Sequence, residues 1–130
     1  MRATKRVVLV VDDEAGIRDV LADLLAMEGY EVLTAANGQQ GLEAYQEGEP
    51  DLVITDIMMP KMNGVDMVLQ LRTRNPKVNV IFMSGFFGAS PSRRDMTDAI
   101  ATFGYPLVHK PFKPTDFLSQ VHSTLSLNGV

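Results

Sequence analysis

Short apolar runs alternate with helix-like segments along the sequence, and this alternation constrains the fold more than any other feature. The run Val7–Val11 holds five aliphatic residues in a row. Such a run is typical of a strand that is buried on both faces, as in a parallel sheet. Further strands are predicted at Glu31–Thr34, Leu52–Ile54, Val78–Met83 and Leu107–Val108.

A helix-like pattern follows each predicted strand. Asn37 is placed to cap the second helix, and Gln40 completes a capping-box pattern three residues later. The pair Asn75–Pro76 ends the third helix, and the fourth begins near Ser90. The apolar residues at helical spacing are Ile17, Val20, Leu21, Leu24 and Leu25, then Leu42 and Tyr45, then Val65, Val68 and Leu69, then Met96, Ile100 and Phe103, and finally Phe117, Leu118, Val121 and Leu125.

The order of the predicted elements places the chain in the α/β class. Strands that alternate with helices over short connections form a parallel sheet with helices on both faces. Five strands are too few for a closed eightfold barrel, so we expect a doubly wound five-stranded parallel sheet with the strand order 2-1-3-4-5. The 130 residues fit a single domain with a core of about residues 5–125, and we expect no output domain in the chain.

Composition and charge exclude several kinds of protein. About 45% of the residues are hydrophobic and 22% are charged, as in an ordinary globular domain. The absence of cysteine excludes disulfide frameworks, thiolate metal sites and cysteine nucleophiles. A net charge of −4 disfavours direct binding of nucleic acid, and the longest apolar run is too short to span a membrane. We therefore expect a cytoplasmic domain.

Polar residues follow four of the predicted strands at the point where each strand ends. In a doubly wound sheet these carboxyl ends meet at one edge, where ligands bind. We therefore expect the polar side chains to lie close together. They are Asp12 and Asp13 after the first strand, Asp56 after the third, Ser84 after the fourth and Lys110 in the segment after the fifth.

This set of side chains suits phosphoryl transfer. Three adjacent carboxylates repel one another unless a cation neutralises them, and oxygen ligands without histidine or cysteine suit a hard ion such as Mg²⁺. A lysine beside them favours a second anion such as phosphate. Each residue alone has an ordinary structural interpretation, such as a helix cap for Asp13 or a turn residue for Asp56, but their shared place at one edge favours the functional one.

Four motifs resemble the receiver domain of two-component response regulators, and together they cover almost the whole chain. They are Val8–Glu14, Asp56–Gly64, Ser84–Gly85 and Lys110–Phe112. The resemblance implies a flavodoxin-like receiver fold and a phosphorylation-dependent signalling domain of a two-component or phosphorelay system. It implies a phosphoacceptor and not a classical enzyme, with limited self-catalysed phosphotransfer and autodephosphorylation.

The resemblance also implies a role for each aspartate. Asp56 would accept the phosphoryl group from a phosphohistidine. Asp12 and Asp13, with Asp56 and the backbone carbonyl of Met58, would hold Mg²⁺, for which Mn²⁺ could substitute. These roles are carried over from the family because the matching residues stand at the matching places in the motifs.

Ser84 and Lys110 are implied to contact the phosphoryl group, Ser84 by a hydrogen bond and Lys110 by an ion pair. The Lys110–Pro111 peptide bond is expected to be cis, a form that only X–Pro bonds adopt readily. Ser84 and Leu107 are the implied switch positions. Leu107 departs from the family, which usually has Tyr or Phe three residues before the lysine, and the segment between Ser84 and Lys110 is longer than usual.

The implied phosphodonor is a sensor histidine kinase or a histidine phosphotransfer protein. The implied output is contact with a downstream protein of unknown identity, without direct contact to nucleic acid or a membrane, by a monomer or weak dimer. Two alternatives stay open: a small phosphatase or phosphotransferase with an aspartate nucleophile, and a receiver that signals without phosphorylation. The first usually needs a second acid two residues after the nucleophile, where Met58 stands.

Overall fold

The helices and strands alternate along the chain as the sequence predicts. The computed structural model describes residues 5–85 and 100–128, so the helix predicted to begin near Ser90 lies outside the described residues, apart from residues 100–103, which are helical. None of the described helices combines the length and the apolar character that a membrane crossing requires. The elements are β1 Val7–Val11, α1 Ala15–Met27, β2 Glu31–Ala35, α2 Gly38–Gly48, β3 Leu52–Asp56, α3 Gly64–Arg74, β4 Val80–Ser84, β5 Leu107–His109 and α5 Pro114–Asn128.

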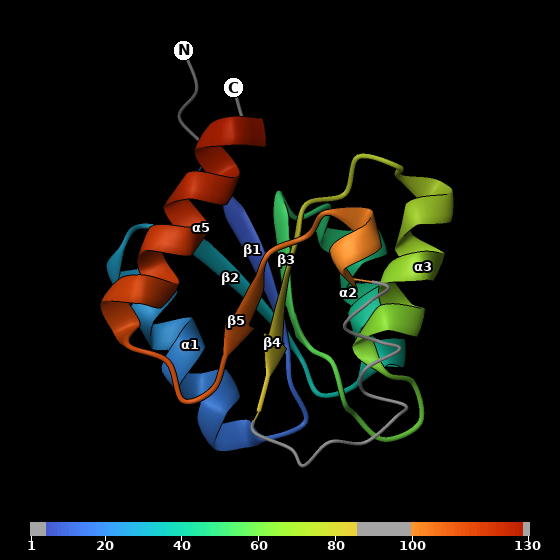
Figure 1. Ribbon diagram of the computed structural model, residues 1–130, viewed down its shortest axis with the longest axis horizontal. Helices are drawn as coiled ribbons and strands as arrows, with labels where there is room; N and C mark the ends of the chain where they lie inside the picture. Colours follow the sequence, from blue (N-terminus) through green and yellow to red (C-terminus); the bar gives the residue numbers. More distant parts are fainter. Residues whose placement is uncertain (1–4, 86–99, 129–130) are drawn as a thin grey trace.

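The five strands form one parallel sheet in the order β2-β1-β3-β4-β5, which confirms the predicted topology. The register pairs Val11 at the end of β1 with Thr55 in β3, and Asp56 with Met83 in β4. The carboxyl ends of the strands therefore lie together along one edge, at the bottom of Figure 1. Residues that follow different strands are brought side by side at this edge.

Helices cover both faces of the sheet (Figure 1). α1 and α5 pack on one face, and α2 and α3 pack on the other. Val8 and Val10 of β1 belong to the core under α1 and α5. Leu9 and Val11 belong to the core under α2 and α3. Because all four side chains are buried, the strand sequence shows no alternation of apolar and polar residues.

Side-chain caps fix the starts of α2 and α3. Asn37 accepts a hydrogen bond from the Gln40 backbone N–H at 2.9 Å, which confirms the predicted cap. The Gln40 side chain accepts from the Ala36 N–H at 2.9 Å, one residue earlier than in a standard capping box. Asn63 caps α3 by accepting from the Asp66 N–H at 2.8 Å, and the sequence analysis did not assign this cap.

Two helices bury a narrower apolar face than the sequence pattern predicts. Val20 of α1 is 54% exposed and Leu69 of α3 is 41% exposed, although both belong to the predicted apolar stripes. The buried face of α3 instead includes Met67 and Leu71. Spacing alone does not show which residues at the margin of a stripe reach the sheet, because that depends on how the helix is rotated about its axis. β4 also begins later than predicted, at Val80.

Candidate functional site

Three aspartates meet at the carboxyl edge of the sheet, where β1 and β3 end. Asp12 and Asp13 follow β1, and Asp56 is the last residue of β3. One carboxylate oxygen from each residue lies within 4.8 Å of the other two. Asp12 and Asp56 are buried, at 0% and 5% exposure, whereas Asp13 is exposed. The predicted cluster is therefore present, and one of its three carboxylates is open to solvent.

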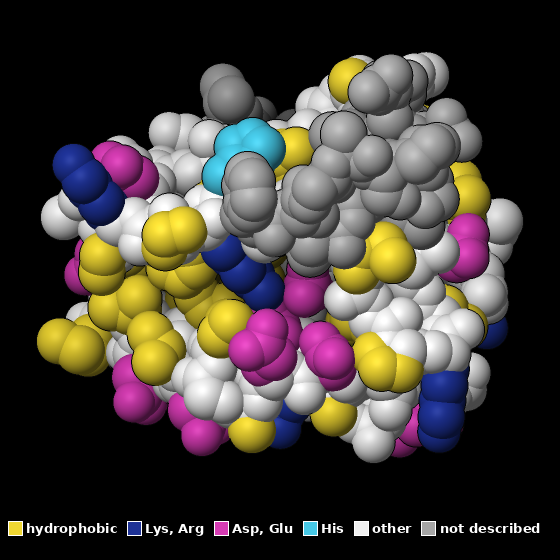
Figure 2. Space-filling view, turned by 60° about the horizontal axis from the view of Figure 1, so that its bottom comes forward, with side chains coloured by type: hydrophobic (Ala, Val, Ile, Leu, Met, Phe, Trp, Pro, Cys, Tyr) yellow, Lys and Arg dark blue, Asp and Glu magenta, His cyan; other side chains and the backbone are white. Residues whose placement is uncertain are grey.

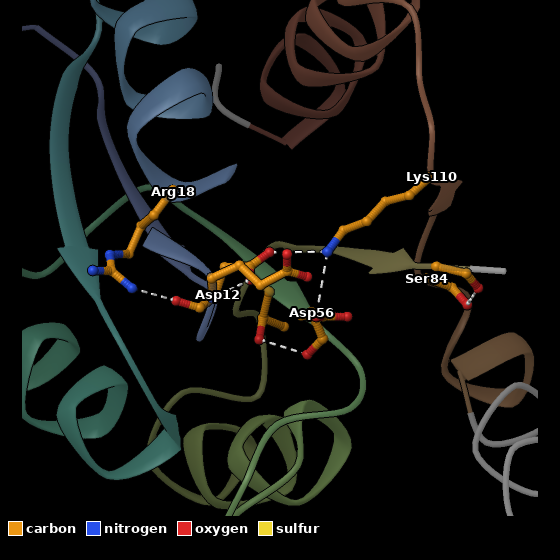
Figure 3. A network of polar contacts seen from close by, with 8 residues as sticks. Asp12, Arg18, Asp56, Ser84 and Lys110 are labelled. Atoms are coloured by element: carbon orange, nitrogen blue, oxygen red, sulfur yellow. Dashed lines mark hydrogen bonds and ion pairs between the residues drawn. The ribbon is translucent and has the colours of Figure 1, made fainter. Parts of the chain in front are cut away.

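Lys110 reaches this aspartate cluster from the end of β5 (Figure 3). Its Nζ lies 3.0 Å from Oδ2 of Asp12 and 3.3 Å from Oδ2 of Asp56, so one ammonium group bridges both buried carboxylates. The Lys110–Pro111 peptide bond is cis, as predicted. Three strands thus contribute to one network of charges.

Burial and neighbouring charge control the protonation of this network. Burial raises the pKa of the Asp56 carboxyl, the Lys110 ammonium partly offsets that rise, and the charge of Asp12 adds to it. Burial alone would lower the pKa of Lys110, but hydrogen bonds and charges from Asp12 and Asp56 outweigh burial and raise it. Lys110 is therefore a permanent cation at neutral pH, and Asp56 is a carboxyl whose ionised form the fold disfavours.

One oxygen of the cluster lacks a hydrogen-bond partner among the residues that the structure describes. This atom is the buried Oδ1 of Asp56, and a buried acceptor without a donor is costly. Mg²⁺ binds oxygen ligands and typically uses one or two carboxylates together with water. The unpaired oxygen of Asp56 and the exposed carboxylate of Asp13 therefore fit a magnesium ion better than they fit a purely structural ion pair.

The loop after Asp56 packs tightly against the end of β3. A Cβ on Gly64 would lie 2.1 Å from the Asp56 carbonyl oxygen, and the Gly64 N–H donates to the Ile57 carbonyl at 2.8 Å. Glycine is required here because two backbone segments approach each other closely. The same loop carries the half-buried Met58, whose carbonyl keeps its metal-binding role as a prediction.

Ser84 lies on the neighbouring strand but does not contact the aspartate cluster by a described hydrogen bond. It ends β4, one position beyond Met83, which is the register partner of Asp56. Its hydroxyl donates to the Gly85 carbonyl at 3.2 Å. Figure 3 shows the Ser84 side chain apart from the bridge between Lys110 and the carboxylates. The strand places Ser84 at the correct edge, and its predicted contact with a phosphoryl group stays a prediction.

The other predicted switch position, Leu107, is half-buried in β5 and pairs with Phe82 of β4. The aromatic residue nearest to it in the sequence, Tyr105, is held at the opposite end of the strands. Its hydroxyl donates to the Val78 carbonyl at 3.1 Å and accepts from Nη1 of Arg72 at 3.0 Å. Tyr105 therefore does not stand in for the aromatic residue that the family usually has at position 107.

Arg18 and Glu14 join the site although the sequence analysis did not assign them there. Nη1 of Arg18 donates to the Asp12 carbonyl at 2.7 Å (Figure 3). The Glu14 backbone N–H donates to Oδ1 of Asp12 at 2.9 Å. The N-cap residue of α1 is Glu14, whose side chain makes no cap hydrogen bond. The helix-cap interpretation of Asp13 is therefore wrong. A basic residue five positions after the Asp12–Asp13 pair was the available signal for Arg18.

An apolar groove borders the aspartate cluster on the side of α1. Figure 2 shows acidic side chains next to a basic one near the centre of this face, with hydrophobic side chains gathered to one side. The groove has a volume of about 630 Å³. Lys110 lines the groove and also contacts two residues of the aspartate cluster, so the two features adjoin. The lining residues are Glu14, Gly16, Ile17, Val20, Leu24, Lys110, Pro111, Phe112 and Pro114.

Comparison with known proteins agrees with the fold. Residues 8–122 match the family model of the response regulator receiver domain. The chemotaxis protein CheY of Thermotoga maritima is 37% identical over 109 residues, which cover 83% of this chain and 88% of that protein. The CheY-like receiver domain structure from Methanospirillum hungatei has a TM-score of 0.86 and 27% identity, and the match covers 97% of this chain and 98% of that chain.

Longer proteins match as well. The probable transcriptional regulator ycf27 of Cyanophora paradoxa is 34% identical over 125 residues, which cover 96% of this chain and 50% of that protein. The chain thus spans about half the length of the ycf27 relatives that it matches.

The fold and the site define a class of signalling domains with an acidic pocket at the carboxyl edge of a five-stranded parallel sheet. The chain belongs to the response regulator receiver domain family. It is a receiver domain of phosphorylation-dependent two-component signalling, and the phosphatase alternative is not favoured. Members of this family are signalling phosphoacceptors that bind Mg²⁺ in an acidic pocket, are phosphorylated by histidine kinases and act on downstream targets.

Proposed function

We propose that Asp56 is the residue that carries the phosphoryl group, received from the phosphohistidine of a sensor histidine kinase or a histidine phosphotransfer protein. The main support is the state of its buried carboxylate. Oδ2 is held by Lys110 at 3.3 Å, and Oδ1 has no described hydrogen-bond partner. With two oxygens, the carboxylate can serve both as a metal ligand and as a nucleophile.

Asp12, Asp13 and Asp56, with the Met58 carbonyl, would hold Mg²⁺, and Mn²⁺ could replace it. When bound, the ion would supply positive charge that offsets the carboxylates and the entering phosphoryl oxygens. The chain itself places the ligands. Asp12 is buried and fixed by the Glu14 N–H at 2.9 Å, whereas Asp13 is exposed and leaves the pocket open to solvent.

In the transfer step, a carboxylate oxygen of Asp56 forms a bond to phosphorus as the phosphorus–nitrogen bond of the donor breaks. The donor imidazole keeps the electron pair of the broken bond. The new group adds up to about two negative charges at this edge. Lys110 can exchange its contacts with the carboxylates for one to a phosphoryl oxygen, and Ser84 can donate to another once its hydroxyl leaves the Gly85 carbonyl. The same residues would support limited self-catalysed phosphotransfer and autodephosphorylation.

The phosphorylated domain would signal by contact with a downstream protein. The added charge shifts the population between two surface states, and Ser84 and Leu107 are the positions through which β4 and β5 would respond. We propose a monomer or weak dimer, with residues 5–125 as one receiver unit. We also propose a cytoplasmic location.

Phosphorylation of the full chain by acetyl phosphate tests this proposal. The intact mass should increase by one phosphoryl group in the presence of Mg²⁺ and stay unchanged in EDTA. Asp56→Ala should take up no phosphate, while Asp19→Ala, which removes an exposed acid on α1, should behave as the wild type. Equal uptake by Asp56→Ala, or no uptake by the wild type with Mg²⁺, would overturn the assignment and favour a receiver that signals without phosphorylation.

A further inference from the structure

Arg18 lies on α1 and contacts the Asp12–Asp13 segment, on the side of the site away from Lys110 (Figure 3). Its Nη1 donates to the carbonyl oxygen of Asp12 at 2.7 Å, a short distance for a charge-assisted hydrogen bond. Its own backbone N–H donates to the Glu14 carbonyl at 3.0 Å. The guanidinium group therefore belongs to a rigid helical turn and contacts the main chain, and no carboxylate partner of Arg18 is found among the described residues.

This contact acts on Asp13 through the geometry of the peptide bond. The Asp12 carbonyl oxygen and the Cα of Asp13 lie in one planar peptide unit. Fixing the oxygen therefore restricts the position of the Asp13 Cα, from which the side chain extends. Asp13 is exposed and has little packing of its own to orient it. The Asp12 side chain is already fixed by the Glu14 N–H at 2.9 Å. Arg18 thus adds a restraint on the Asp12 carbonyl, which is the part of this segment that leads directly to Asp13.

We infer that Arg18 is a positioning residue that holds Asp12 and Asp13 in the arrangement needed to bind a divalent cation. This inference rests on the proposed function of the site. Mg²⁺ demands nearly octahedral geometry, and groups that orient metal ligands typically change metal affinity by about tenfold or more when removed. Arg18 suits this task because its guanidinium is always charged and presents its donors in a fixed plane.

The test is the affinity of the unphosphorylated protein for Mg²⁺, measured by isothermal titration calorimetry. Arg18→Ala should raise the dissociation constant roughly tenfold. The rate of phosphorylation by acetyl phosphate should fall at limiting Mg²⁺ and recover at saturating Mg²⁺, because Arg18 does not touch the reacting atoms. Arg18→Lys should also weaken binding, since it keeps the charge but loses the planar donor group.

Arg74→Ala is the matched control, because it removes the same charge from an exposed position on α3. It should leave Mg²⁺ affinity unchanged. The inference is overturned if Arg18→Ala binds Mg²⁺ as the wild type does, if Arg74→Ala is weakened equally, or if Arg18→Lys has full affinity, which would assign the effect to charge alone. If Arg18→Ala does not fold, Arg18→Lys decides. Failure of the wild type to bind Mg²⁺ would instead count against the proposed function.

Discussion

Asp56 is 5% exposed, and one of its carboxylate oxygens has no described hydrogen-bond partner. Its pKa is raised above the ordinary value of 3.8, mainly by burial. A raised pKa means that the folded state binds a proton more tightly than the unfolded chain does. The ionised carboxylate therefore lowers stability at every pH above its folded pKa, and this cost vanishes below the unfolded pKa. The ionised carboxylate that we propose as the phosphoacceptor therefore lowers the stability of the fold.

We therefore predict that Asp56→Asn is more stable than the wild type at pH 7 without divalent cations, by about 1 kcal/mol. The substitution removes the buried charge, and Lys110 keeps its partner Asp12 at 3.0 Å. The difference should shrink as the pH falls through the folded pKa of Asp56 toward 3.8. Urea unfolding at several pH values in EDTA measures it.

The control for this prediction is Asp19→Asn, which neutralises an exposed acid on α1. Its stability should stay within about 0.5 kcal/mol of the wild type at each pH. A destabilised Asp56→Asn at pH 7, or an advantage that does not change with pH, would show that the ionised Asp56 carboxylate is not the source of the cost.

Gly64 allows a second prediction about a single residue. A Cβ at this position would lie 2.1 Å from the Asp56 carbonyl oxygen, so a backbone segment must move to admit it. We predict that Gly64→Ala lowers the free energy of unfolding by about 2 kcal/mol and slows phosphorylation, because the strain falls on Asp56, the proposed acceptor. Gly16→Ala is the control, since nothing lies within 4 Å of its added Cβ. Equal stabilities of the two variants would contradict the close approach.

Among the elements, β1 and α2 show what the sequence predicts well. The uninterrupted run of β1 predicts a strand buried on both faces because that environment imposes no alternation. The cap at Asn37 is a local signal, since donor and acceptor are three residues apart. Three other features depend on tertiary placement, which residue spacing does not encode. They are the exposure of Leu69 at the margin of the α3 apolar face, the orientation of the Ser84 hydroxyl and the hydrogen bond from Arg18 to the Asp12 carbonyl.

The segment between the helical residues 100–103 and β5 carries a prediction of its own. Tyr105 is held there by the Val78 carbonyl at 3.1 Å and by Arg72 at 3.0 Å, and Arg72 also lies 4.6 Å from the centre of the Phe103 ring. Tyr105→Phe removes both hydrogen bonds and should cost about 1 kcal/mol. Hydrogen exchange should accelerate at the backbone amides of residues 104 and 105, which bond to Ile100.

Tyr30→Phe is the matched control, because the Tyr30 hydroxyl binds His122 at a distant, exposed corner between β2 and α5. Exchange at residues 104 and 105 should be unchanged in that variant. If Tyr105→Phe accelerates exchange uniformly over the whole sheet, the hydroxyl contributes to global stability only. If exchange does not change at all, the Tyr105 contacts do not hold this segment.

In the whole molecule, the two cores bury apolar side chains, whereas the carboxyl edge of the sheet concentrates charged ones. The faces of the sheet are covered by α1 and α5 and by α2 and α3 (Figure 1), and they bury aliphatic side chains. The edge gathers three carboxylates against one bridging lysine. The topology predicted from the sequence requires this gathering, since all five strands run parallel and end on the same side. The stability of the whole domain should therefore depend on cations that bind at this edge.

We predict that Mg²⁺ raises the free energy of unfolding, because an ion that binds only the folded state stabilises it by mass action. At one hundred times the dissociation constant the gain should be about 2.7 kcal/mol. Asp13→Ala should lose most of this gain, while Asp19→Ala should keep it in full. In EDTA the stability of Asp13→Ala should change little, since Asp13 is exposed.

The gain from Mg²⁺ should also decline at low pH, because protons compete with the metal for the carboxylates. The decline should begin above the pH range in which an ordinary aspartate titrates, because the pKa of Asp56 is raised. Thermal unfolding with and without Mg²⁺ measures all of these effects, and a gain that survives in Asp13→Ala would mean that the ion binds elsewhere.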